Sequence, residues 1–190
     1  MNSHVSMQDV AAQGPSSAEA STLAMTILAG DLSVDEAIWR VAKNFMRDDR
    51  VDVVVAALTT FPPHDRTGWT DLGGRAWVRE WSRPRTSVRI APPPGAGPED
   101  ALSMPWLSQI GRTGVAALID RELLPAEAEQ DRLELESIGV RALAMTAFLT
   151  GGRMYGSIAI TSAEAGAWPQ QTIADFQLLV SAITSRLALE

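Results

Sequence analysis

The sequence predicts an α+β fold, in which antiparallel β-strands are combined with helices near both ends of the chain. Three observations support this prediction. Two segments rich in β-branched and small apolar residues flank Gly151-Gly152, which is typical of a β-hairpin because both glycines tolerate a positive φ. An amphipathic helical pattern follows this hairpin and extends to Glu190. A capping signal at Ser33 starts another amphipathic segment near the N-terminus.

The composition limits the classes of function. The chain has 190 residues, enough for one domain of ordinary size and a tail. Its formal net charge of -7 repels phosphate backbones, so we expect no nucleic-acid partner. The chain contains no cysteine, which excludes disulfides, thiolate catalysis and thiolate metal ligands. Because His4 and His64 are the only histidines, we also expect no metal site.

The N-terminal residues have no targeting signal. Residues 1–21 lack the basic start and continuous apolar stretch of a signal peptide, and no segment is judged long and apolar enough to cross a bilayer. We therefore expect no membrane association and a cytoplasmic location, which the absence of cysteine also fits. Residues 1–22 are predicted to be a flexible tail, and residues 23–190 a single domain. A short helix is predicted over residues 18–29, ending before Gly30.

A second helix is predicted after Ser33. Ser33 and Glu36 have the spacing of a capping box, in which side chains and backbone donors satisfy each other at a helix start. The polar residues 48–50 are expected to end this helix. Its packing stripe consists of Ile38, Ala42, Phe45 and Met46.

The middle of the chain predicts short strands joined by loops. Residues 51–61 are rich in β-branched side chains and indicate a buried strand, and an alternating pattern indicates a second strand over 75–81. The Pro- and Gly-rich residues 82–100 are expected to form a mobile surface segment. The other expected elements are a loop over 62–70, a short helix over 105–112 and a short strand over 115–120.

An acidic helix is predicted from Leu124 to Ile138. Pro125 preorganises its first turn, and Gly139 suits its end. Its acidic side chains are interpreted as a solvated face rather than as catalytic carboxylates, because no environment that would raise their pKa values is apparent. They are Glu127, Glu129, Asp131, Glu134 and Glu136.

The diglycine turn fixes the expected register of the hairpin between residues 140–150 and 153–161. Phe148 is expected opposite Tyr155, Thr146 opposite Ser157, and Ala144 opposite Ala159. One face is then a plain apolar surface made of Leu143, Met145, Leu149, Met154, Ile158 and Ile160. The opposite face is small and partly polar, and holds Ala142, Ala144, Thr146, Phe148, Tyr155, Ser157, Ala159 and Thr161.

The last predicted helix begins after Trp168-Pro169 and carries a heptad seam, because apolar residues recur at alternating gaps of three and four. Part of the seam is expected to cover the sheet and the rest to meet a partner helix, which predicts a homodimer through the terminal helices. Since the pattern runs to the last residue, we expect the helix to continue into an output domain absent from this chain. The seam consists of Ile173, Phe176, Val180, Ile183 and Leu187.

The order of these elements and several short motifs resemble GAF domains, a family of small sensory modules. The resemblance is strongest over residues 105–186, follows element order alone over 32–82, and does not cover 1–22. Two departures are Ala147, where the family commonly has proline, and Pro169-Gln170-Gln171, where it has an acidic cap. The motifs are Leu124-Pro125-Ala126-Glu127, Gly139-Val140-Arg141, Gly151-Gly152-Arg153, Gly156 and Ala167-Trp168. Glu80-Trp81 resembles a variety found ahead of bacterial diguanylate cyclases and sensor kinases.

The resemblance implies a GAF/PAS-like arrangement, with the N- and C-terminal helices on one face of the sheet and short helices and loops on the other. The second face would enclose a pocket for an unidentified small molecule, and no cofactor is assigned. The residue pattern of cyclic-nucleotide-binding members is not recognisable, so we discount those ligands. The candidate ligand-binding residues are Trp81, Trp106, Thr146, Tyr155 and Ser157. The same residues are equally compatible with a filled core.

These observations predict a regulatory domain rather than an enzyme. A family branch that reduces methionine sulfoxide needs cysteine, which this chain lacks, and no serine, histidine and acid constellation is apparent. The domain is expected to dimerise and to control a C-terminal signalling output such as cyclic-di-GMP synthesis or turnover, or a histidine kinase. A ligand-free dimerisation module and the regulatory part of a transcription factor are the alternatives.

Overall fold

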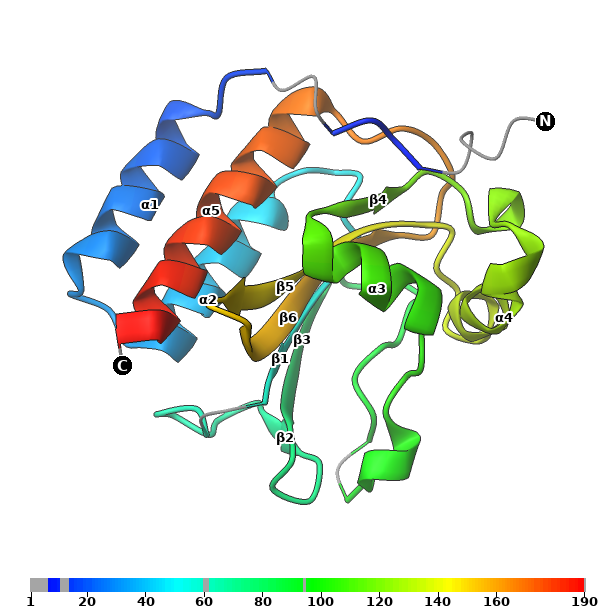
Figure 1. Cartoon of the computed structure of the whole chain (residues 1–190), viewed down its shortest axis with the longest axis horizontal. Helices are drawn as coiled ribbons and strands as arrows, with labels where there is room; N and C mark the ends of the chain where they lie inside the picture. The colour runs from blue at the N-terminus through cyan, green and yellow to red at the C-terminus, as the bar shows by residue number, and fades with distance from the viewer. Residues whose placement is uncertain (1–6, 11–13, 60–61, 94, 190) are drawn as a thin grey trace.

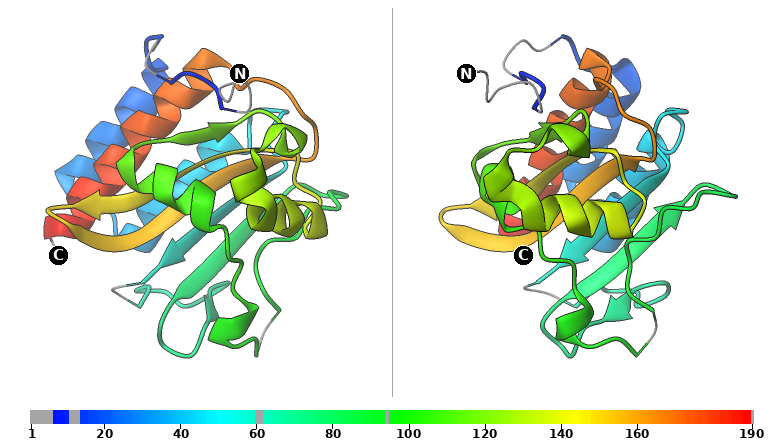
Figure 2. Two further views of the ribbon diagram at one scale, coloured as in Figure 1. Left: turned by 45° about the vertical axis from the view of Figure 1, so that its right-hand side comes forward. Right: turned by 90° about the vertical axis from the view of Figure 1, so that its right-hand side faces the viewer.

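The computed structural model has a six-stranded sheet between two layers of helices (Figures 1 and 2). It describes residues 7–10, 14–59, 62–93 and 95–189. The strand order is β2-β3-β1-β6-β5-β4, and every neighbouring pair is antiparallel. The strands are β1 (Val53–Leu58), β2 (Thr70–Asp71), β3 (Trp77–Ser82), β4 (Ala116–Leu118), β5 (Ala142–Thr150) and β6 (Arg153–Ser162).

Each face of the sheet has its own hydrophobic core. The first core lies under α1 (Ala18–Ala29), α2 (Val34–Phe45) and α5 (Gln170–Leu189). The second lies under α3 (Pro105–Thr113) and α4 (Glu129–Ser137). The predicted α+β class and the placement of both terminal helices on one face are therefore confirmed. Short 3-10 turns at Pro98–Asp100, Arg121–Leu123 and Ala126–Ala128 complete the second layer.

The N-terminal helix is fixed by polar contacts to the last helix. The carboxylate of Asp175 on α5 accepts hydrogen bonds from the backbone N–H and the hydroxyl of Ser17, at 2.7 and 2.8 Å. Ser17 in turn caps α1 by accepting from the N–H of Ala20. The predicted helix over 18–29 is confirmed, so the boundary drawn at residue 22 falls inside α1, where Ala20 is fully buried. Residues 1–6 and 11–13, part of the predicted tail, lie outside the described residues.

The second helix begins as the sequence indicates. Ser33 is the N-cap of α2 and accepts from the N–H of Glu36 at 3.3 Å. Glu36 pairs with Arg40 on the next turn. The strand predicted over 51–61 is β1, Val53–Leu58, and residues 60–61 lie outside the described residues. The strand predicted over 75–81 is β3, Trp77–Ser82.

The two-residue turn of the hairpin is confirmed, but the predicted register is wrong beyond it. Thr150 pairs with Arg153 and Leu149 with Met154, and an irregularity then shifts the pairing by one residue. Phe148 consequently lies opposite Gly156 instead of Tyr155. Because side chains alternate along a strand, this β-bulge exchanges the faces of the following β6 residues. Thr146 pairs with Ile158, Ala147 with Ser157, Met145 with Ala159 and Ala144 with Ile160.

The interpretation of the acidic helix as a solvated face is wrong at one position. Asp131 is fully buried, and its two carboxylate oxygens accept the backbone N–H groups of Trp106 and Leu107 at 3.2 and 2.8 Å. These N–H groups lie in the first turn of α3, where they have no partner within the helix. Asp131 thus caps α3 from α4, and the charge is offset by these bonds and by the positive end of the helix dipole.

The heptad seam of α5 does not present a free surface. All five seam residues are at most 5% exposed, because they pack against the sheet, α1 and α2 within the same chain. The expectation that part of this seam meets a partner helix is therefore corrected. Helix α5 is also long and apolar enough to cross a membrane, contrary to the reading of the sequence, with a mean hydropathy of 1.2 over its best window. Because 56% of that window is buried, its composition reflects its place in the core.

The segment expected to be mobile on the surface contains a buried residue. Val88 is fully buried in the second core, and Ile90 packs against the same cluster. Residue 94 lies outside the described residues. The segment therefore contributes to the wall of the second layer.

Replacement of Gly156 by alanine is expected to destabilise the protein by about 2 kcal/mol or more, because the added Cβ would overlap the carbonyl oxygen of Ala57 on β1. Gly156 has a φ of 155° and pairs with Leu58 at this point of the sheet. Urea denaturation measures the loss. Gly114→Ala is the matched control, since Gly114 has extended backbone and open space around it. Equal stability of the two variants would contradict the bulge geometry.

Candidate functional site

An apolar cavity lies on the face of the sheet covered by α3 and α4. Its volume is about 220 Å³. The sheet supplies one wall, and the second layer supplies the others. The lining residues include Val55, Ala57, Val78, Ile90, Leu102, Met104, Ser108, Leu135, Ile138, Leu143, Met145, Ser157, Ala159 and Thr161.

The β-bulge determines which hairpin side chains face this cavity. Leu143 and Met145 on β5 pair with Thr161 and Ala159 on β6, so all four share the cavity face. The alternating residues of the same strands face α5 and belong to the first core. One pair of strands therefore separates the cavity from the last helix.

The cavity wall carries few polar groups. None of the described residues that line it is ionisable, and the hydroxyl of Thr161 already donates to the carbonyl of Val53 at 3.2 Å. Ser108 and Ser157 supply the remaining hydroxyl groups. A general acid or base would need a titratable side chain at the cavity wall. The arrangement suits binding of a small, largely apolar molecule with one or two hydrogen bonds.

The loop after β3 is held over the cavity by a carboxylate. Glu80 accepts hydrogen bonds from the backbone N–H groups of Ile90 and Ala91, at 2.7 and 2.9 Å. The other carboxylate oxygen accepts from the hydroxyl of Ser82. Since Ile90 lines the cavity, Glu80 fixes one wall from a strand of the sheet. The sequence singled out the Glu80-Trp81 pair as a motif but gave no role to the glutamate.

The structure does not bring the predicted binding residues together. Ser157 lines the cavity, and Trp106 on α3 packs on the same core without being among the lining residues. Thr146, Tyr155 and Trp81 belong to the opposite face, so the expectation that all of them share one pocket is corrected. Thr146 donates to the carbonyl of Gly111 at 3.1 Å.

The bulge accounts for the separation of Ser157 from Tyr155, because it moves Ser157 and Ala159 to the other side from Tyr155. Sequence reasoning missed Leu143 and Met145 as lining residues because they were assigned to a plain core face. The one available signal was Gly156, since glycine within a strand marks a bulge or a close approach of backbones.

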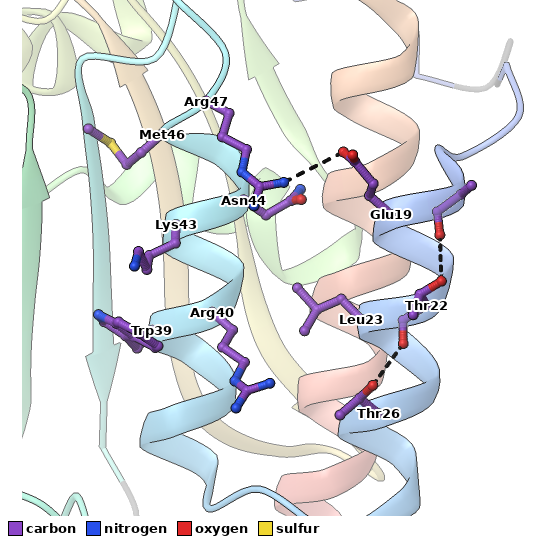
Figure 3. A pocket seen from close by; sticks show the side chains of 11 residues that line it. Glu19, Thr22, Leu23, Thr26, Trp39, Arg40, Lys43, Asn44, Met46 and Arg47 are labelled. Carbon is purple, nitrogen blue, oxygen red and sulfur yellow. Dashed lines mark hydrogen bonds and ion pairs between the residues drawn. The ribbon is translucent and has the colours of Figure 1, made fainter.

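A larger groove of about 710 Å³ lies between α1 and α2 (Figure 3). Leu23 on α1 and Met46 after α2 supply apolar surface. Basic side chains from α2 line it, and Lys43 lies 4.4 Å from the ring centroid of Trp39. Arg47 reaches across to Glu19 at 3.7 Å, and both of these side chains are more than 70% exposed. Such an exposed pair contributes little stability.

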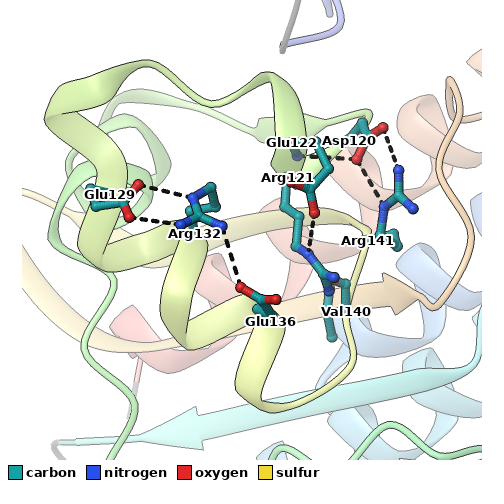
Figure 4. Close-up of polar contacts among 8 residues, drawn as sticks. All are labelled: Asp120, Arg121, Glu122, Glu129, Arg132, Glu136, Val140 and Arg141. Carbon is teal, nitrogen blue, oxygen red and sulfur yellow. Dashed lines mark hydrogen bonds and ion pairs between the residues drawn. The ribbon is translucent and has the colours of Figure 1, made fainter.

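Ion pairs tie the start of β5 to the turns before α4 (Figure 4). Arg141 donates from two guanidinium nitrogens to the two carboxylate oxygens of Asp120, at 2.9 and 2.7 Å. These hydrogen bonds hold the pKa of Asp120 below its usual value. The stability gained from this pair is present above the usual carboxyl pKa and is lost as pH falls through the lowered pKa. The network is structural, since none of its residues lines the cavity.

No group of three or more histidine, cysteine, aspartate or glutamate side chains is placed to hold a metal ion within the described residues. In sequence, no known family model and no characterised protein matches the chain. Solved structures match it in fold. The phycocyanobilin-bound GAF domain of a cyanobacterial phytochrome superposes with a TM-score of 0.62 at 15% identity, over 91% of this chain and 96% of that one. The chain has the GAF fold.

Other GAF-fold structures agree. The chromophore-binding domain of an unusual bacteriophytochrome from R. palustris gives a TM-score of 0.60 at 13% identity and covers 90% of this chain. This chain spans 61% of the length of that one. The GAF domain of an Acinetobacter phosphoenolpyruvate-protein phosphotransferase gives 0.50 at 12% identity, over 91% of this chain and 95% of that one. The predicted GAF resemblance is therefore confirmed at the level of the fold.

Replacement of Glu80 by alanine is expected to raise the hydrogen-exchange rates of the Ile90 and Ala91 amides by roughly tenfold or more, as loss of hydrogen bonds to a charged group implies. Exchange followed by NMR or mass spectrometry measures the effect. Glu99→Ala removes an exposed carboxylate from the same loop and serves as the control. Unchanged protection of the two amides in the Glu80 variant would show that the loop is held by other contacts.

Proposed function

We propose that this protein is a non-catalytic sensory domain that binds a small, largely apolar molecule in the cavity between the sheet and α3. The observation that carries this proposal is the position of β5 and β6, which line the cavity with one face and support α5 with the other. A ligand that contacts Met145 or Ala159 therefore acts on the same strands that α5 covers. The sensory role is the one that a GAF fold and an apolar site without ionisable residues jointly favour.

The ligand that fits is smaller than a bilin. Some GAF-fold structures similar to this chain hold phycocyanobilin or phycoerythrobilin. This chain has no cysteine for a thioether link, and its cavity of about 220 Å³ lies below the roughly 300–1,000 Å³ typical of sites for drug-sized ligands. We therefore infer a compact ligand and a colourless protein.

The signal would pass from the sheet to α5 as a shift in population. A ligand changes an equilibrium between two arrangements only to the extent that it binds one of them more tightly. Helix α5 runs beside α1, to which Asp175 binds it at one end. The opposite end of α5 is the natural point of connection to a C-terminal signalling output in the cytoplasm. Cyclic-di-GMP synthesis or turnover and a histidine kinase are the outputs we propose to test first.

We propose that the domain dimerises through its terminal helices, by a surface other than the heptad seam. Helix α1 has Glu19 as its single charged residue, and Met25 and Leu28 on it are 73% and 53% exposed. This uncharged face adjoins the groove between α1 and α2. The same observation favours the alternative function of a ligand-free dimerisation module, and either reading is compatible with the regulatory part of a transcription factor.

Native mass spectrometry of the freshly purified protein tests the ligand. We expect a mass above that of the chain by one small molecule, and loss of that increment in Ala159→Phe, whose ring would fill the cavity. Ala165→Phe, at an exposed loop position, is the control and is expected to keep the ligand. A bare chain mass for the wild-type protein would contradict ligand binding and would leave the dimerisation module as the function.

Replacement of Met25 and Leu28 together by glutamate is expected to weaken dimerisation by roughly 100-fold, because it places charges in an apolar contact without partners. Sedimentation equilibrium measures the dissociation constant. Leu133→Glu alters a comparably exposed leucine on α4, on the other side of the sheet, and is expected to leave the dimer intact. A wild-type protein that is monomeric at high concentration would contradict the dimer.

A further inference from the structure

Another hollow lies along the edge of β5 beyond its pairing with β4, between the end of α3 and helix α5, and residues from both faces of that strand line it. Its volume is about 370 Å³, within the range of ligand sites. Helices α3 and α5 both pack on β5, so three elements meet there. We call it the hydroxyl groove, because six of its thirteen described lining residues carry a hydroxyl group. The lining residues are Arg112, Thr113, Gly114, Val115, Thr146, Ala147, Leu149, Thr150, Gln177, Val180, Ser181, Thr184 and Ser185.

Four of the six hydroxyl groups of this wall already use their protons within the protein. Thr113 and Thr146 donate their hydroxyl protons to carbonyl oxygens of α3. Thr184 and Ser185 donate theirs to carbonyl oxygens of the preceding turn of α5, at 2.8 and 2.9 Å. Once its proton is used in this way, a hydroxyl oxygen can only accept. The wall therefore presents several oxygens that can accept hydrogen bonds but cannot donate them.

Gln177 strengthens this conclusion. Its side-chain oxygen is buried and has no hydrogen-bond partner within the described part of the chain. A buried acceptor without a partner costs roughly 1–3 kcal/mol, which a hydrogen-bond donor that reached this oxygen would recover. Gln177 lies on α5, one turn before Ser181 and on the same side.

The charge of the groove limits the ligand further. Among the described lining residues Arg112 is the only ionisable one, and it is exposed at the rim. A cationic donor, such as an amine, would be repelled by this guanidinium and would find no carboxylate. A guanidinium instead favours a carboxylate or phosphate, which it can bind through two parallel hydrogen bonds. Hydroxyl groups are donors without a positive charge, and a small ligand can carry several of them together with an anionic group.

We propose that the hydroxyl groove binds a small polyhydroxylated anion, such as a sugar acid or a sugar phosphate. The ligand hydroxyls would donate to the side-chain oxygens of Gln177, Thr184 and Ser185, and Arg112 would hold the anionic group. Five of the lining residues belong to α5, so the ligand would join this helix to β5 and α3. Binding here is independent of the apolar cavity, and only its effect on an output rests on the proposed function.

Isothermal titration of the full chain with sodium gluconate and with glucose 6-phosphate tests the proposal. Sorbitol, acetate and inorganic phosphate are the comparison probes, since they carry hydroxyls without an anion or an anion without hydroxyls. At least one hydroxylated anion is expected to bind at least about tenfold more tightly than each comparison probe, because it makes both kinds of contact. Equal binding of acetate or phosphate, or no binding of either hydroxylated anion, overturns the proposal.

Paired variants locate the site. Arg112→Ala and Thr184→Val are each expected to weaken binding of the hydroxylated anion, the first by roughly tenfold or more. Arg75→Ala removes another exposed arginine, and Thr26→Val removes a hydroxyl that makes the same bond to the preceding turn of α1. Both controls are expected to bind as the wild type does, and thermal unfolding checks that all four variants fold. Binding that survives in both groove variants places the ligand elsewhere and overturns the proposal.

Discussion

Helix α5 buries one apolar side against β5 and β6, and the other helices of its layer are arranged around it. Nine of its 20 residues are buried, and a large side chain such as Phe176 or Ile183 contributes about 1.5–3 kcal/mol when removed from water. Polar contacts then fix its position. Asp175 binds the start of α1, and Thr172 donates to Asp48 in the turn after α2 at 2.7 Å. This helix therefore contributes a large part of the first core.

The segment before α5 is fixed as firmly as the helix itself. Trp168 is 2% exposed, and its ring lies 4.8 Å from the guanidinium carbon of Arg50. Arg50 also donates to the carbonyl oxygens of Gly166 and Ala167, and Gln8 exchanges two hydrogen bonds with the backbone of Trp168. The N-terminal residues 7–8 lie along the edge of β4 through a bridge at Leu118. The start of α5 is therefore anchored by contacts from other segments of the chain.

The apolar cavity lies under the second layer and the hydroxyl groove lies at the edge of β5, and their chemistry differs because different elements cover the two places. The second layer covers the sheet with short helices and a loop, and its apolar side chains leave a cavity that Glu80 helps to close. The first layer covers it with long helices, which leave a polar gap where α3 and α5 diverge. The two hollows therefore differ in polarity, and residues of α5 line the hydroxyl groove alone.

The sequence by itself determined the α+β class, the hairpin turn, the cap at Ser33 and the identity of α5 as a packing helix, because these depend on local spacing and on turn residues. Tertiary structure decided the rest. The bulge beside Gly156 separated Ser157 from Tyr155, since a strand pairs according to its neighbours on both sides. Asp131 is buried because its carboxylate caps the first turn of α3. The seam of α5 is covered by other elements of the same chain. Local periodicity indicates that one face of an element is apolar. Only the packing of the layers determines which other element covers that face.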